Sequence, residues 1–245
     1  MILRRITQHV KEQNWFAVAL DFFIVVAGLL IAFQITEWKD ARSEKQLKRY
    51  YLERLQSDLI ETADHLSGRQ KRVEITLEII DSFAAALNNP DIEDKELVLK
   101  TTDYFERGTD LFDFKVTRAT FDDLSATGNL EILGRGSLVA ALTQLNTNYA
   151  DQDLSLLVNT DWVLGFESTL VAKFDWFRFD ELTSHLFPSK PEAVIAAEIQ
   201  AAADQLRRHA AIHYWIIDNV RGGYAKMITD TQSVHDMIDA ELDDQ

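Results

Sequence analysis

An apolar segment near the start of the chain constrains the fold more than any other feature. Twelve residues from Phe22 to Phe33 (FFIVVAGLLIAF) carry no polar side chain. Extended to the tryptophans on either side, Trp15 and Trp38, the segment has 23 residue steps (38 minus 15). At about 1.5 Å per residue, an α-helix of this length measures roughly 35 Å, which covers a hydrocarbon core of about 30 Å. The sequence therefore predicts one membrane-spanning helix with a tryptophan near each membrane interface.

Two other structures could explain this segment: a cleaved signal peptide, or a buried core helix of a soluble protein. A cleaved signal peptide has small residues at a cleavage site soon after its apolar core, whereas Gln34-Ile-Thr-Glu-Trp38 follows here. A buried core helix of a soluble protein is the alternative that stays open. We expect the segment to remain in the chain as a single-pass anchor.

Drawn as a helix with about 100° between residues, the segment has two different faces. One face carries the bulky residues Phe22, Val26, Leu29 and Phe33. The other carries the small or polar residues Ala17, Asp21, Val25, Gly28 and Ala32. Gly28 and Ala32 stand four apart, a spacing of small residues that lets a partner helix approach closely. We expect this small face to pack on protein, either a second copy or another membrane protein, and the bulky face to meet membrane lipid.

Asp21 is an acidic side chain next to the apolar run. It lies about 9 Å along the helix from Trp15, so its carboxylate is close enough to the interface to reach headgroups and water. A carboxylate inside a membrane is also a candidate for function. Two interpretations stay open: an interfacial or protonated residue without a role, and a paired or proton-handling one.

The residues from Val26 to Trp38 (VAGLLIAFQITEW), followed by a charged helix through Arg42, resemble the N-terminal span of a family of uncharacterised bacterial single-span membrane proteins. That span reads approximately V-x-G-x-x-I-A-x-Q-I-x-x-W-N-x-x-R, and Lys39 stands here where the family often has Asn. A second match is the turn Leu124-Ser-Ala-Thr-Gly-Asn-Leu130, which is similar to a Leu-x-x-x-Gly-Asn-Leu turn of the family. The resemblance implies a bacterial inner-membrane anchor with a helical extramembrane domain, and it implies no activity.

Charge is distributed unevenly along the chain. Residues 1–55 hold nine Lys and Arg against six Asp and Glu, a net charge of +3, whereas residues 56–245 hold 16 against 34, a net charge of −18. So acidic a domain repels nucleic acid and anionic headgroups, and we expect no nucleic-acid binding. The sequence predicts a basic tail and anchor over residues 1–40 and an acidic helical bundle over residues 41–245.

The charges that flank the span bear on its orientation. Three basic residues precede it (Arg4, Arg5 and Lys11), and five follow it (Lys39, Arg42, Lys45, Lys48 and Arg49). Taken literally, this count favours a cytoplasmic C-terminal domain. The short basic N-terminal tail favours the opposite orientation, because it need not be translocated. In addition, acidic residues dilute the second basic cluster and so weaken the count of basic residues after the span. We expect the acidic domain to lie in the periplasm.

Long helices are predicted beyond the span, since the chain has only nine Gly and three Pro. Apolar residues recur at intervals of seven, and we call this set the bundle stripe: Leu52, Leu59, Leu66, Val73, Ile80 and Leu87. The stripe indicates a helix that packs against neighbours, either as the first core helix of a bundle or in an oligomerising coiled coil. The predicted fold class is all-α: one N-terminal transmembrane helix that continues into a long juxtamembrane helix, then an antiparallel helical bundle.

Gly, Pro and Asn divide the remaining chain. Asn88-Asn89-Pro90 is expected to end the long helix, and Asp94 is expected to cap the next one. Further helices are predicted near residues 95–106, 117–126, 138–182 and 191–242. Gly222-Gly223 could interrupt the last of these. An aromatic segment, Phe174 to Phe179, is expected to plug one end of the bundle or to line a pocket.

The residues offer little for catalysis. His209 and His213 stand four apart on a predicted helix, a spacing that can place two imidazoles on one metal ion. The acidic residue of the zinc-protease helix motif is absent and no third ligand is evident, so we expect solvated or core-edge histidines. The sequence has no Cys, no phosphate-binding Gly loop and no nucleophile elbow. We therefore expect no metal site, no cofactor and no enzymatic activity.

These observations favour a membrane-anchored, non-enzymatic interaction or scaffold protein, or an accessory subunit of a membrane assembly. Its expected contact surfaces are the small face of the span and the bundle stripe. Two alternatives stay open. The protein could be a single-span subunit of a proton-driven complex in which Asp21 carries the proton, or an anchored helical domain that senses a ligand.

Overall fold

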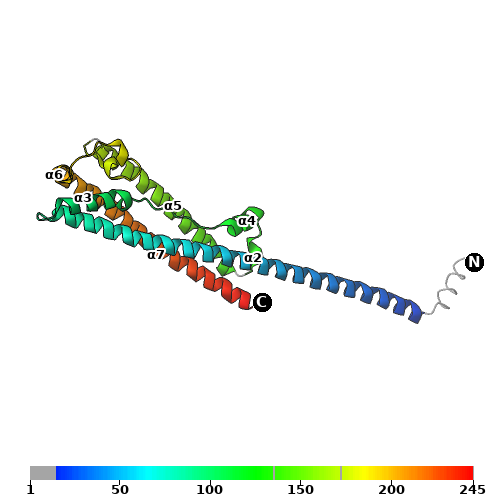
Figure 1. Ribbon diagram of the computed structural model, residues 1–245. Coiled ribbons are helices and arrows are strands. Elements are labelled where there is room, and N and C mark those ends of the chain that lie inside the picture. Colours follow the sequence, from blue (N-terminus) through cyan, green and yellow to red (C-terminus); the bar gives the residue numbers. More distant parts are fainter. Residues whose placement is uncertain (1–14, 135, 172, 245) are drawn as a thin grey trace, which may run out of the picture. The chain divides into compact units, whose positions relative to one another are not determined.

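The computed structural model describes residues 15–134, 136–171 and 173–244, without the side chains of residues 15–18, 21, 169 and 171. The chain divides into two units, Met1–Tyr50 and Tyr51–Gln245, and each is described by itself. Helices dominate, and no strand occurs among the described residues (Figure 1). The predicted all-α fold class is confirmed.

The first helix, α2, spans Trp15–Asn88 and has residues in both units. It continues through Gly68, where the sequence offered a kink. It ends two residues before Pro90, as expected, because proline disfavours helical geometry in the residue before it. The turn that follows is fixed by the side chain of Asn89, whose Oδ1 accepts a hydrogen bond from the backbone N–H of Asp91 at 3.0 Å.

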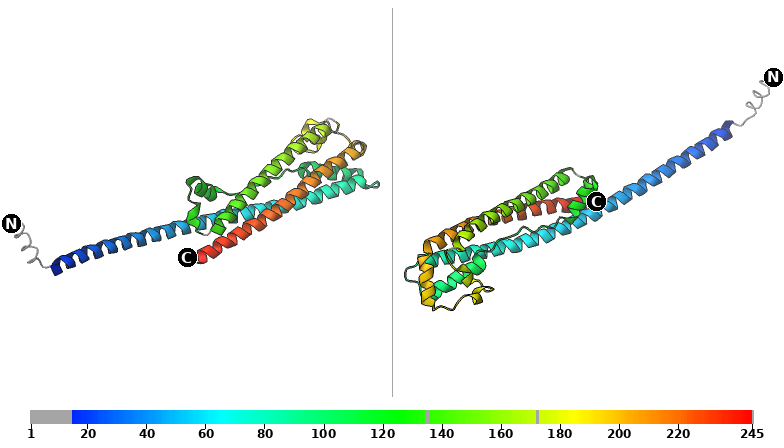
Figure 2. Two further views of the ribbon diagram at one scale, coloured as in Figure 1. Left: turned by 180° about the vertical axis from the view of Figure 1, so that it is seen from behind. Right: turned by 90° about the horizontal axis from the view of Figure 1, so that it is seen from above.

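The second unit contains the other helices that the structure describes. They are α3 (Asp94–Asp103), α4 (Ala119–Thr127), α5 (Gly136–Val171), α6 (Glu192–Ala201) and α7 (Ala203–Asp243). Short turns join them: the π-helical η1 (Tyr104–Gly108) and the 3₁₀ turns η2 (Leu130–Leu133), η3 (Trp176–Phe179) and η4 (Ser184–Leu186). In both views of Figure 2, α5 and α7 lie beside the part of α2 that belongs to this unit. Helices α3 and α6 pack together at the end of the bundle where α2 stops.

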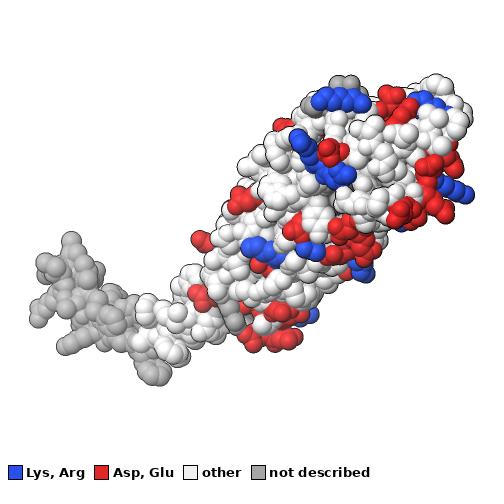
Figure 3. Space-filling model, turned by 90° about the vertical axis from the view of Figure 1, so that its left-hand side faces the viewer, with Lys and Arg blue, Asp and Glu red and all other residues white. Residues whose placement is uncertain are grey.

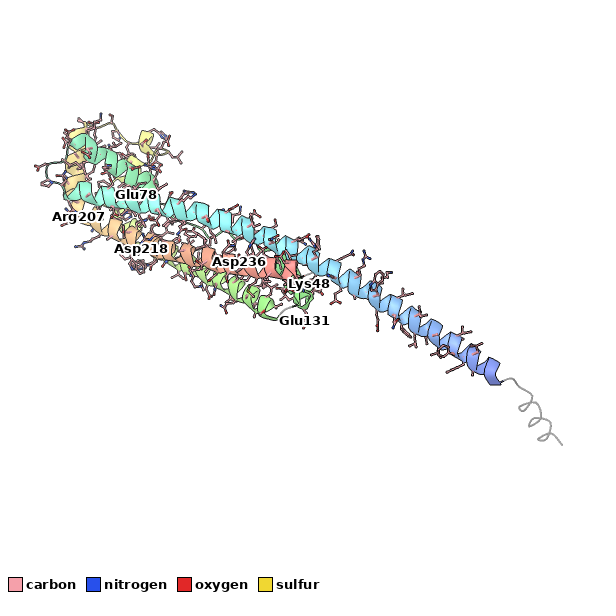
Figure 4. The ribbon with its side chains drawn as sticks, turned by 90° about the horizontal axis from the view of Figure 1, so that it is seen from below. Lys48, Glu78, Glu131, Arg207, Asp218 and Asp236 are labelled. Atoms are coloured by element: carbon pink, nitrogen blue, oxygen red, sulfur yellow. The ribbon has the colours of Figure 1, made fainter. Side chains whose placement is uncertain are left out.

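Helices α2 and α7 are antiparallel, and their side-chain contacts show the register. Gln56 donates a hydrogen bond to Asp239, Arg221 lies 3.7 Å from Glu74, and Arg207 donates to Asn88 at 2.9 Å. From the first contact to the last, the α2 position rises from 56 to 88 and the α7 position falls from 239 to 207, 32 residues in each case. Figure 4 shows Arg207 at the start of α7, beside the end of α2. The two helices therefore keep the same antiparallel register over this whole length.

An irregular segment after η1 returns along α2 to the start of α4. Arg69 Nη2 lies 2.6 Å from Asp113 Oδ1, and the hydroxyl of Thr62 accepts a hydrogen bond from the Thr117 N–H at 2.9 Å. Asp58 accepts a bond from the Thr120 N–H at 2.9 Å. This N–H belongs to the first turn of α4, which has no intrahelical acceptor for it. A side chain of α2 thus serves as the cap of α4.

Helices α5 and α7 are also antiparallel and approach closely at Gly223. A Cβ atom on Gly223 would lie 2.7 Å from Gln152 Oε1 and 3.3 Å from Phe114 Cζ. Further along α7, Asp230 accepts a hydrogen bond from Asn148 of α5 at 3.0 Å. The absence of a side chain at Gly223 therefore makes room for neighbours that belong to α5 and to the return segment.

Several helix ends differ from the sequence-based expectation. Asp94 is the first residue of α3 and not its cap, a place that Glu93 takes without a side-chain hydrogen bond. Helix α5 ends at Val171, well before Leu182, because the aromatic segment folds into 3₁₀ turns. Gly222 and Gly223 lie inside an unbroken α7, whereas the break that was not foreseen falls at Ala202.

All six residues of the bundle stripe lie in the core, and none is more than 5% exposed. They belong to one core cluster with buried residues of α3, α5 and α7. This burial fits the first core helix of a bundle and leaves no stripe residue for a coiled-coil partner. The stripe is therefore not a contact surface, contrary to the expectation from sequence.

Candidate functional site

The predicted span belongs to the unit Met1–Tyr50. Among the described residues, α2 is the one helix that is long and apolar enough to cross a membrane. Ten large apolar side chains between Phe22 and Trp38 are each 57–70% exposed. Nothing in the described part of the chain buries this apolar surface.

Three residues of the small face, Val25, Gly28 and Ala32, are exposed. A Cβ atom added to Gly28 would meet no atom within 4 Å, so this side of the helix is open. The side chains of Trp15, Ala17 and Asp21 lie outside the described residues. At the other end of the segment, Arg42 Cζ lies 5.6 Å from the centre of the Trp38 ring. This cation–π contact gives the exposed tryptophan a polar neighbour, as suits a membrane interface.

The surface of the second unit is predominantly acidic. In Figure 3, Asp and Glu side chains outnumber Lys and Arg on the face shown, over the bundle helices. Several bases pair with acids that are near them in the sequence, as Lys190 does with Glu198 and Arg118 with Asp122. The absence of nucleic-acid binding, expected from this acidic excess, stays a prediction.

His209 and His213 are buried, with 6% and 1% of their surfaces exposed. The expectation of solvated or core-edge histidines is therefore wrong. Both lie on the side of α7 that carries the buried residues Leu206, Ala210 and Ile216. The helical spacing of four places the two imidazoles next to each other, with ring centres 4.6 Å apart.

Glu167 of α5 completes the cluster. Its Oε1 lies 3.4 Å from His213 Nε2. One potential metal-ligand atom from each of Glu167, His209 and His213 lies within 4.8 Å of the other two. Glu167 carries no signal in the sequence, because it belongs to another helix and only the packing of α5 on α7 brings it to the histidines. A second group, His235 with Asp236 and Asp239, lies on the more exposed part of α7.

Tyr104 binds the other side of His209, through a 2.7 Å hydrogen bond between its hydroxyl and Nδ1. It begins the π-helical turn η1, a distortion that is frequent at functional sites. Its ring stacks on Phe83, with centres 4.2 Å apart. Burial and the negative charge of Glu167 raise the pKa of Tyr104 well above its usual value, so the phenol is neutral.

His209 is neutral as well. Burial, and then the neighbouring His213, lower the pKa of His209 from 6.5 to about 3. A neutral imidazole has one donor nitrogen and one acceptor nitrogen. The bond to Tyr104 uses Nδ1, so Nε2 is the nitrogen of His209 that has no hydrogen-bond partner among the described residues.

Aromatic residues close the end of the bundle near this cluster. Phe105 of η1 stacks on Trp176 and Phe179 of the aromatic segment, with ring centres 5.6 and 5.8 Å apart, and lies 6.0 Å from the His209 ring. Phe179 is buried. This packing agrees with the plug that the sequence suggested. It also keeps water away from one side of the histidines.

A cavity of about 630 Å³ lies between α5 and α7 on another side of His209. Its wall includes Phe166 and Leu170 from α5, Arg208, His209 and Ile212 from α7, and Lys173. The cavity gives small solutes a route to the edge of the His209 ring.

Apolar side chains also lie exposed on the outside of the bundle. We call this set the α5 face: Leu154, Val158, Trp162 and Phe166 of α5, with Trp215 of α7. Each is 41–61% exposed. The Trp162 ring centre lies 4.9 Å from that of Phe166 and 5.7 Å from that of Trp215. Surfaces of this kind often mark interaction sites on soluble domains.

No family model, curated protein or solved structure matches this chain. The resemblance of the span residues to bacterial single-span proteins therefore stays a prediction. The geometry of the described residues carries the functional proposals that follow.

Proposed function

We propose that the protein is a single-span protein of a bacterial inner membrane, and that its bundle is a non-enzymatic interaction or scaffold domain or an accessory subunit of a membrane assembly. The observation that carries the proposal is the row of ten exposed apolar side chains between Phe22 and Trp38. Burial of one large apolar side chain is worth about 1.5–3 kcal/mol, so ten left in water would be very unfavourable. A bilayer removes all of them from water at once.

Two surfaces support an interaction role. The small face of the span is open at Gly28, so a second helix can approach it without a steric clash. The α5 face offers two tryptophans, a residue type that is enriched at the energetic centres of protein interfaces. It takes the place of the bundle stripe as the contact surface of the second unit, because the stripe is buried.

The short basic N-terminal tail favours an acidic bundle on the periplasmic side. The more numerous basic residues after the span oppose this orientation, but Glu37, Asp40 and Glu44 dilute them. A reporter that is active in one compartment only, fused to Gln245, tests the orientation directly. Activity of a cytoplasm-specific reporter would contradict it.

Association through the small face is tested with the isolated span, residues 1–45, by cross-linking in membranes. Gly28→Leu is expected to weaken self-association by about 1 kcal/mol, because the added side chain separates the two helix axes. Leu29→Ala is the matched control on the bulky face and is expected to change little. Equal weakening by both variants would mean that the face is assigned wrongly. A wild-type span that does not associate would contradict self-association in the membrane.

A further inference from the structure

The adjacent imidazoles of His209 and His213 each contain a buried nitrogen without a hydrogen bond. The Nε2 atoms of His209 and His213 are both buried, and neither has a hydrogen-bond partner among the described residues. Buried polar side-chain atoms in native proteins are nearly always paired, because an unpaired one has lost its water without replacement. Two such atoms on adjacent imidazole rings, with the Glu167 carboxylate 3.4 Å from one of them, call for a common partner.

The distance between Glu167 and His213 fits a shared ion better than a direct bond. Their Oε1 and Nε2 atoms are 3.4 Å apart. A hydrogen bond between an imidazolium and a carboxylate is shorter, about 2.7–2.9 Å. Two ligands that each lie about 2.0–2.1 Å from one tetrahedral zinc ion are separated by about 3.4 Å. The separation of this pair therefore agrees with two ligands of one tetrahedral ion, and the third ligand atom lies within 4.8 Å of both.

Tyr104 prepares His209 for the same role. A metal ligand of this type usually donates its second ring N–H to a nearby oxygen, which fixes both the tautomer and the ring orientation. Here Nδ1 lies 2.7 Å from the Tyr104 hydroxyl, which can accept such a bond. The Tyr104 ring is fixed in turn by its stacking on Phe83. The bond at Nδ1 therefore leaves Nε2 as the nitrogen of His209 that can bind a metal ion.

We propose that His209, His213 and Glu167 bind a single Zn²⁺ ion through the two Nε2 atoms and a carboxylate oxygen. Two histidines and one glutamate, with a water molecule in the fourth position, form an established zinc ligand set. The carboxylate of Glu167 neutralises one of the two positive charges of the ion, which lowers the cost of placing the ion in the core. The cavity beside His209 provides a path of entry.

The ion would join α5 to α7, since Glu167 belongs to one helix and the histidines to the other. A ligand that binds the folded chain and not the unfolded chain raises the melting temperature. The proposal is independent of the membrane-anchored interaction role, because all of its residues lie in the second unit.

The test uses the full chain in detergent, stripped of metal with a chelator and titrated with Zn²⁺ by calorimetry. One saturable site per chain is expected, together with a higher melting temperature in the presence of Zn²⁺. Glu167→Gln keeps the shape of the side chain but removes its charge, and is expected to lower the affinity by more than the 10–100-fold typical of a lost outer partner. His213→Gln provides a second ligand variant, and circular dichroism verifies that each variant is folded.

Two matched controls separate this site from other histidines. His185 is exposed, and His235 belongs to the second acidic group, so His185→Gln and His235→Gln are expected to leave the tight site intact.

Tyr104→Phe keeps the stacked ring but loses the hydroxyl, and is expected to weaken binding by about 10–100-fold. Replacement of Zn²⁺ by Co²⁺ should give the intense visible absorption of a four-coordinate ion in the wild type and lose it in Glu167→Gln.

Three results would overturn the proposal. The first is the absence of saturable Zn²⁺ binding by the wild-type chain. The second is unchanged affinity in both Glu167→Gln and His213→Gln. The third is loss of the site in His235→Gln alone, which would place the ion on the outer part of α7.

Discussion

Single residues of α2 differ sharply in what surrounds them. Leu59 is buried in the bundle stripe, whereas Glu61, two positions further on, is exposed. Leu59→Asp is expected to reduce the free energy of unfolding by about 3 kcal/mol or more, because an unpaired charge would enter the core. Glu61→Asp should change it by about 0.5 kcal/mol or less. Thermal unfolding of a fragment that lacks residues 1–38 measures both, and equal effects would show that the stripe is not core.

Among the residues of the core and the histidine cluster, those that share one helix could be predicted from the sequence, and those contributed by other segments could not. The spacing of His209 and His213 is visible because a helix places residues four apart on one side. The same periodicity revealed the stripe. Glu167 and Tyr104 could not be found in this way, because they reach the histidines through packing between separate helices. The abundance of carboxylates, 40 in the chain, gave no reason to single out one of them.

Two adjacent glycines show how one helix accommodates its neighbours. Gly222 is exposed and a Cβ there would meet no atom within 4 Å, whereas Gly223 faces Gln152 and Phe114. Gly222→Ala is expected to stabilise the protein by about 0.5–1 kcal/mol, since alanine favours helix more than glycine does. Gly223→Ala should lose this gain and fall about 1 kcal/mol below it, because the neighbours must move apart. Chemical denaturation of the same fragment compares the free energies of unfolding of the two variants. Equal stabilisation would show that α7 does not approach α5 closely at Gly223.

Helix ends were predictable where the chain carries a strong breaker and unpredictable elsewhere. Asn89 and Pro90 end α2, and Gly128 turns the chain after α4 with a positive φ of 71°. No such residue marks the end of α5 at Val171 or the break at Ala202. The first follows from the aromatic segment, which packs on Phe105. The structure offers no comparable local reason for the second.

For the whole molecule, the chain divides its charge and its apolar surface between two regions. Residues 1–55 have a net charge of +3 and contain the exposed apolar row, whereas residues 56–245 have a net charge of −18. The second unit has its own core and its own internal hydrogen bonds. We therefore expect it to fold and stay in solution without the anchor, and the apolar row alone to hold the full chain in the membrane.

Membrane fractionation tests this central claim most directly. Cells that express the full chain are broken, and the membranes are washed with carbonate or high salt, which removes peripheral proteins. We expect the intact full chain in the washed pellet, because about 30 Å of its first helix is held by apolar contact with lipid. A fragment that lacks residues 1–38 should appear in the supernatant as a helical protein. Recovery of most of the intact full chain in the supernatant would contradict the account.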